Sequence, residues 1–252
     1  MKLKSLVLLC FLLPSTTLSQ ETGLKSQYGN ADNLMKIVTE KMSENDQKKL
    51  AFTYNATHVL RRLDDKGRLL KNSSGKPDEI TETILIYGHA NKMQRQILER
   101  NGEKPIDQNS AGFFLDISKT LTIRYDFYFP YDQPINIGGK TYIVVNFRPK
   151  SNLTFGPEKE DQVMNRAEGK IFIDSNSLLI WKLEAWLKNE FTIATWFKVF
   201  SANFMIEQQN VDDIVIEKII TITSRYRNGW GIFVDPKNLD EVYTFYNYRR
   251  MY

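Results

Sequence analysis

Alternating apolar and polar residues dominate this sequence from Leu50 onward, and this pattern most constrains the fold. In the first such segment, one face carries apolar residues and a histidine, while the other carries polar residues. The first face comprises Leu50, Phe52, Tyr54, Ala56, His58 and Leu60, and the second comprises Thr53, Asn55, Thr57 and Arg61. Because side chains alternate between the two faces of a β-strand, this period of two predicts a strand buried on one side.

Similar segments follow almost to the end of the chain, separated by turn signals such as Asn101-Gly102 and Gly138-Gly139. The further predicted strands are 68–72, 80–87, 93–100, 123–129, 141–148, 170–174, 178–187, 202–209, 214–225 and 241–250. Strands joined by short turns favour an antiparallel meander, since parallel neighbours need long crossovers. We therefore predict a mainly β (α+β) fold with one antiparallel sheet of about ten or eleven strands.

Helical signals interrupt the strands at a few places. Apolar residues recur at helical spacing in 34–42, and Asp32 or Asn33 can cap the start of this short amphipathic helix. Residues 156–169 have a proline near the start, acidic residues in the first turn and a closing glycine, which predicts a second helix. The less regular stretch 105–119 is compatible with a short helix or a turn.

The first 19 residues have the composition of a secretory signal, so we expect residues 20–252 to form a single mature domain. Cleavage would remove Cys10, the only cysteine, together with Lys2 and Lys4, leaving 32 basic against 30 acidic residues. The mature chain would then offer no disulfide, thiol nucleophile or cysteine metal ligand. A net charge this small also argues against nucleic-acid binding. The apolar run before Cys10 is too short for a lipoprotein signal, which favours simple export.

Signals for catalysis are poor. His58 and His89 stand 31 residues apart without metal-binding spacing, and His58 is better explained as a packed core residue of its strand. The segment Gly138-Gly139-Lys140-Thr141 resembles part of a phosphate-binding loop, but its place between two strands favours a hairpin. We therefore predict no enzymatic activity, no catalytic residues, no metal and no cofactor.

Apolar residues are in excess on several strands and in one segment, 191–200. Strands with bulky residues on both faces are covered on both sides or line an apolar cavity. The segment 191–200 is compatible with a strand that anchors the core or with an apolar flap over a ligand site. An acyl chain needs only such a lining, because burial stabilises it by ~0.8 kcal/mol per methylene. The candidate ligand-binding residues are Phe127, Phe129, Trp181, Phe191, Trp196 and Phe197.

From about Leu34 onward the sequence resembles bacterial secreted proteins of the outer-membrane lipoprotein-sorting type (LolA/LolB/RseB-like). The resemblance rests on the following segments: Leu63-Asp64-Asp65-Lys66-Gly67-Arg68, Glu99-Arg100-Asn101-Gly102-Glu103-Lys104-Pro105, Val144-Val145-Asn146-Phe147-Arg148-Pro149, Asn165-Arg166, Gly169-Lys170-Ile171-Phe172-Ile173-Asp174 and Tyr246-Asn247-Tyr248-Arg249-Arg250. It implies a half-barrel, in which a strongly curved antiparallel sheet has short helices on its concave side. The stretch 105–119 departs from the family, where a longer charged helix is usual.

The leading functional hypothesis is a periplasmic, non-enzymatic protein that holds an acyl chain or a lipidated partner in its apolar concave cavity. Lipoprotein sorting or transport and peripheral contact with a membrane would fit this role, and the oligomeric state stays open. The alternative is an envelope interaction or structural module whose cavity is filled by its own side chains. A hydrolase is the third alternative, and it requires a buried polar cluster around His58 or His89.

Overall fold

The computed structural model describes residues 23–90, 92–105, 117–151, 159–194, 197–229 and 237–251. The expected signal segment, including Cys10, and the candidate residue Trp196 lie outside these residues. No helix in the described part of the chain is long and apolar enough to cross a membrane.

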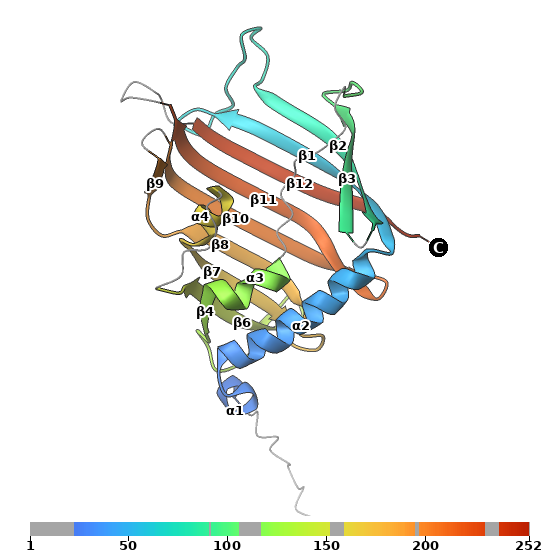
Figure 1. Cartoon of the computed structure of the whole chain (residues 1–252), viewed down its shortest axis with the longest axis vertical. Coiled ribbons are helices and arrows are strands. Elements are labelled where there is room, and N and C mark those ends of the chain that lie inside the picture. Colours follow the sequence, from blue (N-terminus) through green and yellow to red (C-terminus); the bar gives the residue numbers. More distant parts are fainter. Residues whose placement is uncertain are drawn as a thin grey trace, which may run out of the picture.

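One large antiparallel sheet forms most of the molecule (Figure 1). Within the described residues its twelve strands are β1 Phe52–Leu63, β2 Glu79–His89, β3 Lys92–Arg100, β4 Tyr125–Tyr128, β5 Ile135–Ile137, β6 Lys140–Pro149, β7 Ala167–Asp174, β8 Ile180–Leu187, β9 Phe191–Ala194, β10 Phe197–Val211, β11 Ile214–Asn228 and β12 Lys237–Arg250. The spatial order is β3-β2-β1-β12-β11-β10-β8-β7-β6-β4, with β5 beside β6 and β9 beside β10. The predicted single antiparallel sheet is confirmed. The last strand, β12, lies between β1 and β11 and pairs with both.

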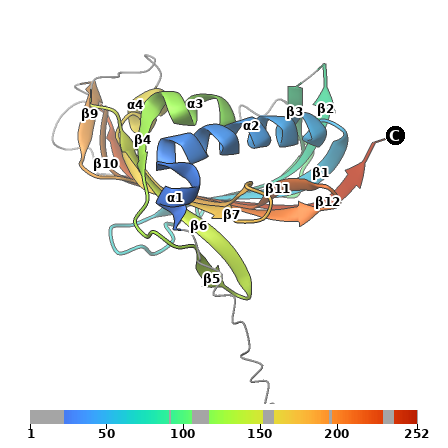
Figure 2. The ribbon, with the colours of Figure 1, turned by 90° about the horizontal axis from the view of Figure 1, so that it is seen from below.

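Four helices lie on the concave side of this curved sheet (Figure 2). They are α1 Leu24–Tyr28, α2 Ala31–Lys49, α3 Ile117–Arg124 and α4 Lys159–Met164. The long helix α2 starts after Asn30, whose side-chain oxygen accepts a hydrogen bond from the Asn33 backbone N–H at 2.8 Å. Asn30 is therefore the N-cap in place of the expected Asp32 or Asn33. The helix also continues past Met42 to Lys49, because its buried face extends through Asn45 and Lys49.

The main hydrophobic core lies between the helices and strands β4, β6, β7, β8 and β10. Leu34 and Val38 on α2 are fully shielded, and they belong to the same cluster as Val145 on β6 and Ile171 on β7. Phe147 and Tyr125 pack edge to face, with ring centroids 4.8 Å apart. This half of the concave side is therefore filled by the chain's own helices and side chains.

Truncating Leu34 to alanine should lower the free energy of unfolding by about 2–5 kcal/mol, because it leaves a cavity in a fully buried site. Ile37 lies on the same helix with 38% of its surface exposed, so I37A is the matched control. We expect it to cost less than about 1 kcal/mol. Urea unfolding of the two variants provides the comparison, and equal losses would contradict this description of the core.

The strands predicted over 68–72 and 123–129 differ from the structure. Residues 68–72 form no strand: they make only isolated bridges, Leu63 with Leu69 and Lys71 with Pro77. The Asp64 side chain holds the turn by accepting backbone hydrogen bonds from Lys66 and Arg68, which competes with regular pairing.

The predicted strand 123–129 begins two residues late, because Ile123 and Arg124 end α3. Lys150 stabilises this helix end: its ammonium donates a hydrogen bond to the Thr122 carbonyl at 2.9 Å. Only Tyr125–Tyr128 then pairs with β6.

The helix predicted over 156–169 is shorter, because α4 ends at Met164 and Ala167 starts β7. Gly169 therefore lies inside a strand and does not terminate a helix. A Cβ atom placed there would lie 2.0 Å from the Glu184 carbonyl oxygen and 2.6 Å from Phe147 Cζ. The glycine is explained by this close approach of three strands.

Candidate functional site

A second apolar cluster covers the concave face of β1, β2, β11 and β12. Its buried members are Phe52, Tyr54, Ala56, Ile84, Ile86, Ile214, Ile216, Tyr243 and Phe245. We call this set the concave apolar band. Ile220 packs against both this band and the main core, which places the two clusters on one face of the sheet.

Strand register sets the centre of the band. Ala56 on β1 lies opposite Ile84 on β2 and Phe245 on β12, so a small, fully shielded side chain stands between two larger ones. Helix α2 packs with β4, β6 and β7 through the main core and contacts β11 through Asn45 and Lys49, while Leu121 of α3 belongs to the main core. The residues of the band are at most 8% exposed, and the Arg95 guanidinium on β3 lies over its Tyr243 ring, 5.9 Å from the centroid.

Polar side chains on β1, β2 and β3 lie in a row beside the band. We call His58, Glu82 and Arg100 the polar row. Register places Glu82 on β2 and Tyr243 on β12 on either side of His58, and Arg100 on β3 lies opposite Glu82. His58 Nδ1 lies 3.1 Å from a Glu82 carboxylate oxygen, and the Arg100 Nε–H donates to the other oxygen at 2.7 Å. The His58 ring stacks on Tyr243 with centroids 4.1 Å apart. His58 and Glu82 are each only 8% exposed, so this is a buried charged cluster.

The environment of His58 favours its protonated form. Burial acts against the charge, but the carboxylates of Glu241 and Glu82 outweigh it and raise the pKa of His58 above its ordinary value of 6.5. The Glu241 carboxylate lies 3.4 Å from Nε2, on the side of the ring opposite Glu82. An imidazolium between two carboxylates holds β1, β2 and β12 together at this point.

The raised pKa of His58 predicts a pH-dependent stability. The folded protein binds this proton more tightly than the unfolded chain, so the stabilisation is complete below pH 6.5 and is lost as the pH rises through the folded pKa. We expect H58Q to flatten the pH dependence of urea unfolding between about pH 6 and pH 8. The control is H89Q, because His89 is exposed at the end of β2. An unchanged slope in H58Q would contradict this assignment.

The His58 cluster supplies the buried polar group that the hydrolase alternative required, but it lacks the other parts of a hydrolytic site. The two carboxylates lie on opposite sides of the imidazole, and His58 makes no hydrogen bond to a hydroxyl group of a described residue. Throughout the described ranges, no group of three or more His, Cys, Asp or Glu side chains is placed to hold a metal ion. Among the described residues, the cluster pairs charges between β1, β2 and β12.

Helix α2 is attached to the edge of this face by buried polar contacts. The Lys49 ammonium donates to Glu217 on β11 at 2.8 Å and lies 3.2 Å from Asp46. The Asn45 side chain donates to the Val215 carbonyl at 2.7 Å and accepts from the Val215 backbone N–H at 2.8 Å. These contacts fix the C-terminal end of α2 where the helix-covered core meets the concave apolar band.

The structure distributes the candidate ligand-binding residues over separate places. Phe127 and Phe129 pack with the main core beside the helices. Trp181 instead stacks on Tyr142, at centroids 4.4 Å apart. These residues do not share one site with the other candidates, and their roles in ligand binding stay predictions.

The described residues of the segment, 191–194 and 197–200, belong to β9 and to the start of β10, which is the strand alternative for them. Phe191 pairs with Val199 across the two strands and lies under the Arg166 guanidinium, 4.5 Å from its ring centroid. Phe197 stacks on Tyr226, with centroids 5.5 Å apart. Both phenylalanines thus lie where β9 pairs with the start of β10.

Sequence reasoning missed the concave apolar band as a unit and the polar row beside it. Phe52, Tyr54, Ala56 and His58 were correctly assigned to one face of β1. Their partners on β2 and β12 depend on hairpin register and on a contact between the first and last strands. A period-two pattern contains neither piece of information.

Comparisons with known proteins return distant structural similarities. No known family profile and no curated protein matches the sequence. A DUF1329 family protein from Desulfovibrio piger aligns at 12% identity and a TM-score of 0.34, over 86% of this chain and 92% of its own. An outer membrane lipoprotein-sorting protein domain from Vibrio parahaemolyticus aligns at 11% identity and a TM-score of 0.35, over 86% and 93%. The MucA/MucB complex from Pseudomonas aeruginosa aligns at 9% identity and a TM-score of 0.24, over 86% and 99%.

These similarities include the lipoprotein-sorting type that the sequence resembles. At such TM-scores, the function has to be argued from this chain's own residues.

Proposed function

We propose that this chain is an exported binding protein whose concave apolar band holds an acyl chain of a lipid or of a lipidated partner. The observation that carries the proposal is an apolar cluster that crosses β2, β1, β12 and β11 on the concave face, beside the core that the helices fill. An apolar sheet face has to be covered by another element or by a ligand. The signal-like residues 1–19 support export, and a periplasmic location fits this role.

The position of the polar row determines how such a ligand would be oriented on the band. His58, Glu82 and Arg100 lie at one side of the band, while Phe52 and Ile86 lie toward the other. An acyl chain would lie along Ala56, Ile84 and Phe245, between the polar row and Arg95, which is opposite Ile86, because burying charged groups against methylenes is unfavourable. Its polar end would lie toward the row.

A substitution in the band tests the proposal. A56W places a bulky side chain between Ile84 and Phe245, whereas T57W places the same side chain on the opposite face of β1. We expect displacement of a fluorescent fatty acid to show at least about tenfold weaker binding in A56W, equivalent to 1.4 kcal/mol, and little change in T57W. Thermal unfolding of both variants shows whether A56W is folded, and A56L provides a smaller change at the same position.

The self-filled alternative is favoured by one observation. Ala56 and Ile84 are already shielded to 0% and 1% exposure, so an acyl chain would have to replace contacts that shield them now. An envelope interaction module with a solid interior would bind no fatty acid as wild type and release no lipid on extraction. In that case A56W would change only stability, and the acyl-chain proposal would be wrong.

A further inference from the structure

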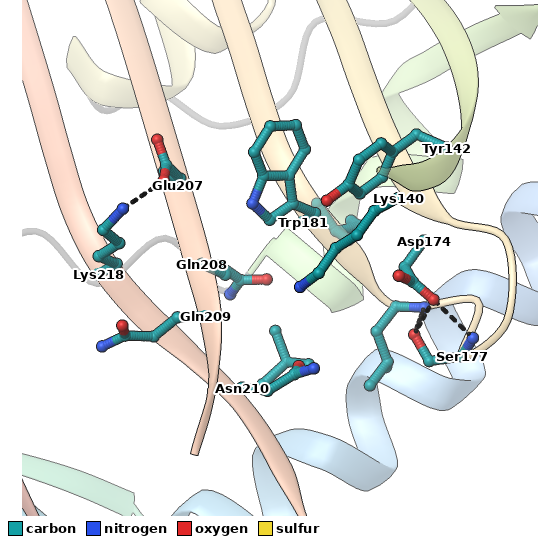
Figure 3. A pocket seen from close by; sticks show the side chains of 13 residues that line it. Lys140, Tyr142, Asp174, Ser177, Trp181, Glu207, Gln208, Gln209, Asn210 and Lys218 are labelled. Atoms are coloured by element: carbon teal, nitrogen blue, oxygen red, sulfur yellow. Dashed lines mark hydrogen bonds and ion pairs between the residues drawn. The ribbon is translucent and has the colours of Figure 1, made fainter. Parts of the chain in front are cut away.

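A pocket of about 320 Å³ lies at one end of the sheet, on the face opposite the helices (Figure 3). Strand β10 pairs with β8 only up to Glu207, and beyond that residue it continues beside β11 alone. The space between this free part of β10 and the β7–β8 turn is the pocket. Glu207 and Tyr142 line it, while their strand neighbours Ile206 and Ile143 face the main core. The pocket is therefore separate from the concave apolar band.

The Gln208 side chain is the first sign that this pocket takes a ligand. Gln208 is only 4% exposed, and its amide oxygen has no hydrogen-bond partner among the described residues. Figure 3 shows the amide pointing into the space between β10 and β8, beside Trp181. A buried amide without a partner is unfavourable unless a donor from another molecule reaches it.

An aromatic wall is the second sign. Trp181 is the extra residue of a β-bulge: Phe172 pairs with Lys182 and Ile173 pairs with Ile180. Bulges are frequent where a strand redirects a side chain toward a site. Trp181 is held in place by stacking on Tyr142 and by an edge-to-face contact with Phe172, at centroids 6.2 Å apart.

Most of the charged side chains that line the pocket already have partners within the chain, and one cation is left to pair with a ligand. Glu207 is paired with Lys218 at 2.7 Å. Asp174 accepts hydrogen bonds from the Ser177 backbone N–H and hydroxyl, at 2.9 and 3.1 Å, and so holds the β7–β8 turn. Lys140 makes no ion pair with a described residue, and its ammonium points into the pocket in Figure 3.

We propose that this pocket binds a saccharide that carries a carboxylate. A ring hydroxyl would donate to the Gln208 amide oxygen, the apolar face of the ring would lie against Trp181, and the carboxylate would pair with Lys140. The volume lies at the lower end of the range of ~300–1,000 Å³ for small-molecule sites, which suits a short saccharide. A polyphosphate is disfavoured relative to a single carboxylate, because its several negative charges would face one cation, Lys140, beside the carboxylates of Glu207 and Asp174.

Saturation-transfer NMR of the full chain with D-glucuronate, D-glucose and acetate tests the proposal. We expect transfer to both sugars, stronger binding of glucuronate than of glucose, and no transfer to acetate. K140A should weaken glucuronate binding by about fivefold without changing glucose binding, as expected for loss of one exposed ion pair. Q208L and W181A should weaken the binding of both sugars.

K76A is the matched control, because Lys76 is an exposed lysine in a loop outside the pocket. If W181A does not fold, K140A and Q208L still decide the result. The proposal is overturned if wild type shows no transfer to either sugar, if acetate binds as well as glucuronate, or if all variants bind alike. None of these outcomes affects the acyl-chain proposal, because the two sites lie on opposite faces.

Discussion

Replacing Gly169 with alanine should destabilise the protein by about 3 kcal/mol or more, because the added methyl group would overlap atoms of the two neighbouring strands. Gly169 lies in β7 between Phe147 on β6 and Ala185 on β8. The new Cβ would be 2.0 Å from the Glu184 carbonyl oxygen, which belongs to the backbone of a central strand and cannot rotate away. It would also be 2.6 Å from Phe147 Cζ, on a side chain that is 2% exposed and tightly packed.

The effect is large compared with the ~5–15 kcal/mol by which native proteins are stable. Urea unfolding of G169A measures it, and loss of soluble protein would be its extreme form. The matched control is G102N, in the turn after β3: Gly102 has a φ of 84° and no atom near its Cβ position. Asparagine tolerates this conformation better than other residues, so we expect a cost below about 1 kcal/mol. A stable G169A would show that β6, β7 and β8 do not approach as described.

Replacing Lys49 with methionine should cost about 2–3 kcal/mol, because it leaves the partly buried Glu217 carboxylate, whose side chain is 22% exposed, without its partner. The Lys49 side chain is 7% exposed, and its ammonium is 2.8 Å from Glu217. Burial acts against the Glu217 charge, but Lys49 outweighs it and lowers the pKa of Glu217 below its ordinary value. The contribution of the pair is therefore present at neutral pH and is lost as the pH falls through the folded pKa of Glu217.

The double variant K49M/E217L removes both charges and should recover much of the stability, since an apolar pair can replace a buried ion pair. K48M is the control, because Lys48 is an exposed neighbour on α2. Thermal unfolding of the single, double and control variants completes the test. If K49M and K48M had equal effects, the contact between α2 and β11 would not stabilise the fold.

Much of the sheet could be predicted from local sequence. Turn residues such as Asn101-Gly102 and Gly138-Gly139 take positive φ values in the structure, so the hairpins at these positions follow from backbone sterics. The alternation along β1 correctly assigned Phe52, Tyr54 and Ala56 to the buried face. Period and turn chemistry are local properties, and they are sufficient for these elements.

The remaining differences arise from contacts between distant segments. Gly169 has the residue type of a helix stop, but its role depends on the Glu184 carbonyl fifteen residues away. Lys49 and Asn45 extend α2 because β11 supplies partners for both. The bulge at Trp181 depends on the pairing between β7 and β8. The sequence of one strand alone therefore does not predict the pocket that Trp181 lines on the face opposite the helices. Pairing and burial between remote strands are not encoded in a local pattern.

Photo-crosslinking of a fatty acid with a diazirine near the end of its chain tests the proposed function most directly. Irradiation of the wild-type protein with this probe, followed by peptide mass spectrometry, locates the chain. The proposal predicts labels on β1, β2 and β12 around Ala56, Ile84 and Phe245, which unlabelled fatty acid suppresses and A56W abolishes. Labels that fall only outside the concave apolar band, or that excess fatty acid does not suppress, would contradict it.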